Sequence, residues 1–177
     1  MTLFDQIMRR GMPQAASPSE QDPVWSWTEE EILAHYTQGQ CHVFAVALSR
    51  LTGLPLAALW NPFEWHVQPD EDGHGGVPEI VHVYVTTPAG TVVDVRGERT
   101  LEELRRSEAG PDWQVCPFGP LTDERLYGLV HVSGNLRPYD EADIADALEV
   151  IRRTPHLAEA AARYGEVAEP GASAPRI

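Results

Sequence analysis

The sequence contains no lysine, and all 13 of its basic residues are arginine. Against 27 acidic residues they leave a formal net charge of −14. Binding of nucleic acid requires clustered basic side chains that neutralise phosphates, so this balance argues against a nucleic-acid partner. It argues equally against an anionic membrane surface. Codon bias in a GC-rich genome explains the missing lysine in the simplest way.

Long apolar runs and cysteines are also scarce. No segment reaches the 18 or more apolar residues of a membrane span, and residues 1–23 lack the apolar centre of a secretory signal. The two cysteines, Cys41 and Cys116, are too few for a disulfide framework. We expect a reduced, cytoplasmic protein, with delivery into another cell as an effector as the alternative. No P-loop or G-x-G-x-x-G pattern occurs, and no cofactor is expected.

The length and composition predict one folded domain. A chain of 177 residues suits a single domain, and an apolar content of 42% is enough for a core. A short amphipathic piece followed by a Pro/Ser/Gln run predicts a mobile N-terminal arm over residues 1–23. Residues 166–177, rich in Ala, Pro and Gly, predict a flexible tail. Residues 24–165 form the predicted domain.

Helices are indicated by capping signals and by apolar residues spaced three and four apart. Thr28 and Glu31 form a capping box that opens a helix near Glu29. The next helix carries one apolar stripe, and Gly53 is placed to end it. The predicted helices cover about residues 29–38, 41–52, 100–110, 140–153 and 154–165.

Strands are predicted where β-branched and aromatic residues cluster. One covers residues 56–60, and two more, 80–87 and 91–96, form a hairpin around Pro88-Ala89-Gly90. Residues 121–132 are ambiguous, because they start as a helix and can end as a strand. The sum is an α+β fold with a helix-flanked antiparallel sheet of three or more strands.

Cys41 is the most informative single residue. It follows Gly39-Gln40 and lies in the first turn of a predicted helix. The start of a helix carries a partial positive charge and unpaired backbone N–H groups. Both favour the thiolate, which is the nucleophilic form of cysteine, and the same N–H groups can hold an oxyanion. The alternative is a small, buried and unreactive residue.

His82 and Asp94 each interrupt a valine-rich predicted strand, where a simple core would have another apolar residue. Across the predicted hairpin, Asp94 faces positions near Val83, within one or two residues of His82. A carboxylate there can fix the tautomer and orientation of an imidazole, as a catalytic triad requires. The alternatives are a histidine on the wet side of the strand and an exposed acid paired with Arg96 or Arg99.

These segments carry a family resemblance. Gly39-Gln40-Cys41-His42 and its helix, then Val81-His82-Val83 and Val93-Asp94-Val95, resemble the catalytic core of the papain-like and transglutaminase-like cysteine hydrolase superfamily. The resemblance spans roughly residues 38–97, about a third of the chain. It implies a papain-like core, in which the helix of the cysteine packs on an antiparallel sheet, with extra C-terminal helices in this chain.

The resemblance implies a thiol hydrolase or acyltransferase with a Cys41-His82-Asp94 triad and a thioester intermediate. The substrate is expected to be an amide of a protein or peptide, without nucleic acid or membrane. A peptidase fits this chemistry, as does a glutamine deamidase or a transglutaminase-like effector or toxin. A further alternative is a non-catalytic interaction protein of phage or plasmid origin that keeps the papain-like scaffold.

Supporting roles are predicted for five other residues. In the superfamily a glutamine upstream of the cysteine can donate to the oxyanion, and Gln38 and Gln40 are both candidates. Trp60, Phe63 and Trp65 lie between the predicted cysteine helix and histidine strand. They are candidates to line a substrate groove, although core or lid packing is the more common role of such residues.

Other chemistry-bearing residues are assigned lesser roles. His66 is the main rival to His82 as the base, because its segment also has strand character. His42 lies about 100° around the helix from the cysteine, so we expect a solvated position or a substrate contact. His131 resembles His82 in its local context, and Cys116 is expected to be structural. The acidic and histidine-rich residues 64–74 match no metal-binding pattern, so no metal site is predicted.

Overall fold

The computed structural model describes residues 23–67, 71, 76–109, 116–133 and 136–165. The N-terminal arm predicted for residues 1–23 therefore falls outside the described residues except for Pro23. The tail predicted for residues 166–177 falls outside them entirely. No helix among the described residues is both long and apolar enough to cross a membrane.

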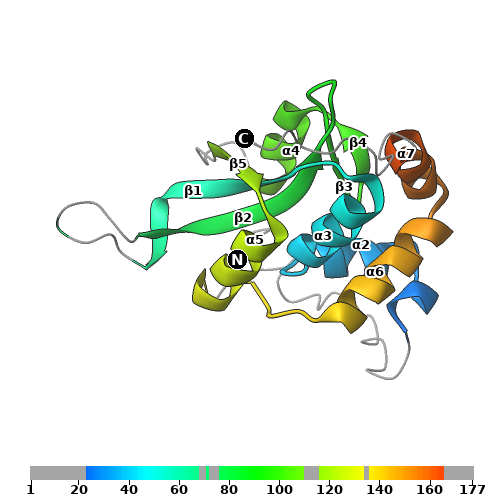
Figure 1. The fold of residues 1–177 in the computed structure, drawn as a ribbon, viewed down its shortest axis with the longest axis horizontal. Helices are drawn as coiled ribbons and strands as arrows, with labels where there is room; N and C mark the ends of the chain where they lie inside the picture. The colour runs from blue at the N-terminus through cyan, green and yellow to red at the C-terminus, as the bar shows by residue number, and fades with distance from the viewer. Residues whose placement is uncertain (1–22, 68–70, 72–75, 110–115, 134–135, 166–177) are drawn as a thin grey trace, which may run out of the picture.

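A five-stranded antiparallel sheet forms the centre of the described structure (Figure 1). Its strands follow the order β4-β3-β2-β1-β5. β1 and β2 are the long strands, and together they extend away from the helices as a two-stranded arm (Figure 1). The strands are β1 (Leu56–Val67), β2 (Val77–Thr86), β3 (Val92–Asp94), β4 (Gly97–Arg99) and β5 (Cys116–Leu121).

The helices begin where the capping signals predict. Thr28 caps the helix Glu29–Thr37 and Asp140 caps the helix Glu141–Arg153, each through a reciprocal capping box. The helical elements are η1 (Val24–Ser26), α2 (Glu29–Thr37), α3 (Cys41–Thr52), α4 (Leu101–Ala109), α5 (Asp123–Ser133), α6 (Glu141–Arg153) and α7 (Pro155–Gly165). The predicted α+β class, with helices flanking an antiparallel sheet, is confirmed.

The structure resolves one ambiguity of the sequence prediction and differs from it in two other details. The end of the ambiguous segment 121–132 is helical, because Thr122 caps α5 and Leu126 and Val130 are buried at helical spacing. The predicted strand 91–96 is shorter, since Gly97, with φ +97°, turns the chain back into β4. β5 was not predicted, because its sequence contains two prolines and a glycine, which are rare in strands.

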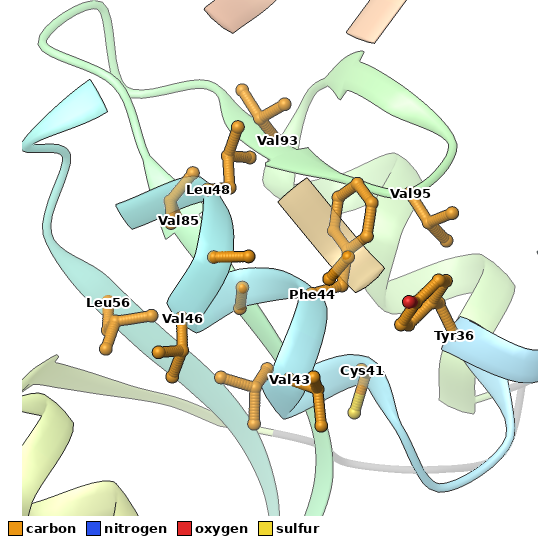
Figure 2. Packing of buried hydrophobic residues seen from close by; sticks show 14 of the residues in the cluster. Tyr36, Cys41, Val43, Phe44, Val46, Leu48, Leu56, Val85, Val93 and Val95 are labelled. Atoms are coloured by element: carbon orange, nitrogen blue, oxygen red, sulfur yellow. The ribbon is translucent and has the colours of Figure 1, made fainter. Parts of the chain in front are cut away.

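The core lies on both faces of the sheet. On one face α3 packs against β2, and α6 and α7 cover the outer side of α3. Figure 2 shows Phe44 and Leu48 of α3 directed toward valines of β2 and β3, with Cys41 at the beginning of the helix. On the other face Leu104 of α4 packs against Tyr84 of β2. Burial of each large apolar side chain contributes about 1.5–3 kcal/mol.

A β-bulge lies next to His82. In the pairing of β1 with β2, Leu59 is opposite His82, whereas Trp60 is opposite Ile80, so Val81 is an extra residue in β2. Bulges bend a strand and redirect its side chains, and they are frequent next to functional sites. The bulge therefore lies next to His82, the histidine that the sequence predicts as part of the site.

Candidate functional site

Cys41 is positioned by the tight connection between α2 and α3. α2 ends at Thr37, and Gly39 takes φ +94°, a left-handed conformation that favours glycine. Gln40, the N-cap of α3, makes no side-chain capping hydrogen bond to the helix. Cys41 therefore begins a 12-residue helix whose first-turn N–H groups lack a side-chain cap. Its side chain is 4% exposed.

His82 and Asp94 come together on neighbouring strands. β2 pairs with β3 through Val85 opposite Val93, and extending this register places Asp94 on the same face as His82. Nε2 of His82 lies 2.9 Å from Oδ2 of Asp94, and the two residues are 0% and 2% exposed. The carboxylate accepts a hydrogen bond from this nitrogen. The sequence-predicted pairing of the two residues is present in the structure.

The second ring nitrogen of His82, Nδ1, is not used by Asp94. It is buried and has no hydrogen-bond partner of ordinary geometry among the described residues. Burial raises the pKa of the Cys41 thiol, but the charges and hydrogen bonds of His82 and His42 together outweigh burial and lower this pKa to about 6. Burial lowers the pKa of His82, but the negative charges of Cys41 and Asp94 raise it to about 10. A thiolate–imidazolium pair is favoured.

Asp94 is held by two further partners that the sequence suggested only as alternatives. Its Oδ1 accepts the backbone N–H of Arg96 at 2.9 Å, and its Oδ2 accepts a second hydrogen bond from the Arg99 guanidinium. Burial raises the pKa of Asp94, but the bond from His82 and the charge of Arg99 bring it below its ordinary value. The carboxylate is therefore buried and ionised, and it pairs with His82 and Arg99 at once.

Glu108 of α4 also reaches this site, although the sequence analysis did not single it out. Its side chain is 9% exposed, and its Oε2 lies 3.6 Å from Nδ1 of His82. Its other oxygen, Oε1, is bound by Arg96 and Arg99. A signal for it exists in the sequence, because Leu101, Leu104 and Glu108 share one helical face. Glu108 thus carries a charge at a position where the stripe predicts an apolar residue.

A metal ion does not fit these groups well. Ligand atoms of His82, Asp94 and Glu108 lie within 4.8 Å of one another, the one such group among the described residues. Both carboxylates are already neutralised by guanidinium groups, Asp94 by Arg99 and Glu108 by Arg96. A cation would have to displace these ion pairs, so the arrangement favours acid–base chemistry over coordination.

The two oxyanion candidates lie in different places. Gln38 is exposed at the end of α2. Gln40 is buried beside Cys41, and its Oε1 has no hydrogen-bond partner among the described residues. Gln40 lines a cavity of about 20 Å³ together with Asp143 and Asp146 of α6. Gln40 is therefore adjacent to the nucleophile and buried, whereas the side chain of Gln38 is exposed.

The aromatic substrate candidates lie along β1. The rings of Trp60 and Trp65 are half-buried and meet edge to face with centroids 6.1 Å apart. Phe63 between them is 70% exposed. His66 lies on the same strand, but its side chain is outside the described part of the chain, so this rival base is not compared with His82. Cys116 begins β5, and its side chain is likewise outside the described part.

One expectation about a histidine is wrong. His42 is fully buried, not solvated, because the chain around Tyr139 covers this side of α3. Its Nε2 donates to the carbonyl of Arg137 at 2.8 Å, and the ring also interacts with the Cys41 thiol. His131, whose local sequence resembles a strand, lies on helix α5.

A larger cavity lies away from the three residues. It measures about 710 Å³ and is lined by residues of η1, α2, the α6–α7 junction and the turn after β3, including Trp25, Trp27 and Arg96. Cys41, His82 and Asp94 do not line it. The Cys41 thiol is therefore buried outside this cavity. The cavity reaches the site only at Val95 and Arg96, which directly follow Asp94.

No family model, no curated protein and no solved structure matches this chain. The assignment of the site therefore depends on the geometry and electrostatics of its own residues.

Proposed function

We propose that this chain is a cysteine-dependent hydrolase of papain-like type that acts on amide bonds of a protein or peptide. The observation that supports it most is the buried imidazole of His82. Asp94 binds one of its nitrogens at 2.9 Å, and the charge of the ring lowers the pKa of the Cys41 thiol to about 6. These are the relationships that an activated nucleophile, its base and an orienting group require.

The first half of the proposed reaction forms a thioester. The Cys41 thiolate attacks the carbonyl carbon, and the oxygen becomes an oxyanion. The C–N bond then breaks, and the proton on Nδ1 of His82 passes to the leaving amine. Asp94 holds the ring in one tautomer throughout and stabilises its charged form. The sulfur is now acylated and His82 is neutral.

The N-terminus of α3 is the proposed oxyanion site. Helix N-termini present backbone N–H groups and a partial positive charge, and α3 lacks a side-chain cap that would occupy them. Gln40 is the nearer of the two side-chain candidates. An oxyanion on the carbon bound to the Cys41 sulfur would form next to these donors.

A second candidate, glutamine deamidation or transfer of a glutamine acyl group, is favoured by the closure of the site. Cys41 is 4% exposed, and it lines none of the cavities described above. A main-chain amide needs an open groove on both sides of the reacting bond, whereas the carboxamide of a glutamine side chain is narrow and terminal. Both candidates share the same thioester.

Selective alkylation tests the proposal. Iodoacetamide at about pH 7 reacts with thiolates, so Cys41 is expected to react faster than Cys116, as read by peptide mass mapping. His82→Ala should abolish the difference in rate between the two cysteines. The matched change His131→Ala, at an exposed position of α5, should preserve it. Equal and slow reaction of both cysteines in the wild-type protein would overturn the enzyme and leave a non-catalytic interaction protein as the better account.

A further inference from the structure

The carboxyl group of Glu108 lies at the ring nitrogen that Asp94 does not use. Its Oε2 is 3.6 Å from Nδ1 of His82, and no part of the ring is exposed to solvent. α4 brings it there because Leu104, one turn earlier, is fully buried against the same face of the sheet. His82 is thus flanked by Asp94 at Nε2 and by Glu108 at Nδ1.

Two arginines fix how Glu108 faces the histidine. Arg96 and Arg99 both bind Oε1 of Glu108, which leaves Oε2 as the oxygen directed toward His82. Arg99 also bonds to Ser107 at 2.7 Å and to Asp94. The arginines therefore tie the two carboxylates on either side of His82 into one network.

We propose that Glu108 is a positioning residue for the second half of the reaction, the hydrolysis of the thioester, an inference that rests on the proposed function. In that step water attacks the acyl carbon and gives a proton to Nδ1 of His82. The C–S bond then breaks, its electron pair returns to the Cys41 sulfur, and the acid product leaves. The thiolate and the imidazolium are restored, and Glu108 stabilises the imidazolium as it forms.

Glu108 matters in this half because the charge of His82 changes there. Before acylation His82 is already an imidazolium with the Cys41 thiolate as its counter-ion, and attack by the thiolate leaves that charge in place. A group that stabilises the starting state and the transition state equally does not change the rate. In the thioester the Cys41 thiolate is gone and His82 is neutral. A carboxylate at Nδ1 then stabilises the transition state, in which His82 becomes charged, and not the starting state.

The test separates the two halves with p-nitrophenyl acetate, whose leaving group needs no proton, so that His82 releases its proton to solvent before hydrolysis. In a Cys116→Ser background, a rapid burst of nitrophenolate reports acylation of Cys41, and the steady phase reports hydrolysis. Glu108→Gln is expected to keep the burst rate and the iodoacetamide rate within about twofold and to slow the steady phase about tenfold. Mass spectrometry should then show acetylated Cys41 accumulating.

Glu102→Gln is the matched control, because it removes the same charge from an exposed position of α4. It should leave both phases unchanged. If Glu108→Gln fails to fold by circular dichroism, Glu108→Asp, which keeps the charge at a shorter reach, should slow the steady phase alone. Equal losses in both phases, no loss in either, or faster alkylation would overturn this role for Glu108. A wild-type protein with neither burst nor fast alkylation would overturn the proposed function itself.

Discussion

His82 and Asp94 face each other across the β2–β3 hairpin, with Nε2 of the histidine 2.9 Å from Oδ2 of the aspartate. Both side chains are buried, and only 12 residues of sequence separate them. The bond occupies Nε2, so Nδ1, which lies 3.6 Å from Oε2 of Glu108, is the nitrogen available for proton transfer. The electrostatic state of Cys41 depends on this pair, since the charge of His82 is what lowers the pKa of the thiol.

The alkylation rate of Cys41 is expected to form a plateau between two titrations. The pKa of the thiol is lowered to about 6, so the thiolate is present above that pH. The pKa of His82 is raised to about 10, so its charge is lost only as the pH rises through that value. Iodoacetamide rates should therefore rise through about pH 6 and stay level through neutral pH, with the two groups titrating as a pair.

In His82→Ala the plateau should disappear at neutral pH, because only His42 then opposes burial and the pKa of the thiol rises. The absorbance of the thiolate in the ultraviolet provides an independent readout. A wild-type profile that rises only above about pH 8, like that of a free cysteine, would contradict the ion pair.

Asp94→Asn is expected to lower both stability and reactivity. The pKa of Asp94 is held below its ordinary value, so its ionised form stabilises the fold above the pKa of the unfolded chain. That contribution is lost as the pH falls through the folded pKa. Loss of one partner from a buried ion-pair network costs about 3–5 kcal/mol at neutral pH, which urea unfolding should measure, and the difference from wild type should shrink in acid.

Asp146→Asn is the control for this change. Burial raises the pKa of Asp146, so its charged form is disfavoured in the fold and its neutral replacement should not destabilise the protein. If both variants lose the same stability at neutral pH, the network around Asp94 is not special.

The sequence predicted best those parts of the structure that short local patterns determine. Capping boxes and apolar stripes placed the helices, and the β-rich runs on either side of Pro88-Ala89-Gly90 placed the hairpin. The hairpin then placed Asp94 within one or two residues of His82 on the neighbouring strand. These are short-range relationships, and the periods of helix and strand determine them.

The parts of the site that depend on packing between distant elements were not predicted. Glu108 interrupts the apolar stripe of its helix, but the groups that this face meets are unknown until α4 is known to pack on β2. His42 lies on a helix face that is exposed in isolation and that the segment near Tyr139 covers. β4, which carries Arg99 to Asp94, is three residues long and has no strand pattern of its own.

Leu104→Ala tests whether the packing of α4 supports the site. Leu104 is fully buried, and replacing a buried leucine by alanine costs about 2–5 kcal/mol. The midpoint of urea unfolding should fall accordingly. Leu101→Ala, at a half-buried position of the same helix, should cost less. Equal effects at both positions would mean that α4 is not anchored through Leu104.

Phe63→Ala tests the aromatic groove on β1. Phe63 is 70% exposed, so the change should leave the melting temperature within about 1 °C. If the ring contacts substrate, turnover of a p-nitrophenyl ester with a phenylpropionyl group should fall about fivefold, while that of the acetyl ester stays constant. An unchanged ratio of the two rates would assign Phe63 to the surface alone.

α3 packs on the sheet, but it precedes in the sequence the hairpin that carries His82 and Asp94. Contacts within a hairpin close short loops and form early in folding, whereas docking of a separate helix closes a longer one. Until α3 docks, Cys41 is an ordinary thiol without an imidazolium beside it. The Cys41 thiol therefore becomes reactive only when α3 has docked. The rate of its alkylation during refolding should report when this docking occurs.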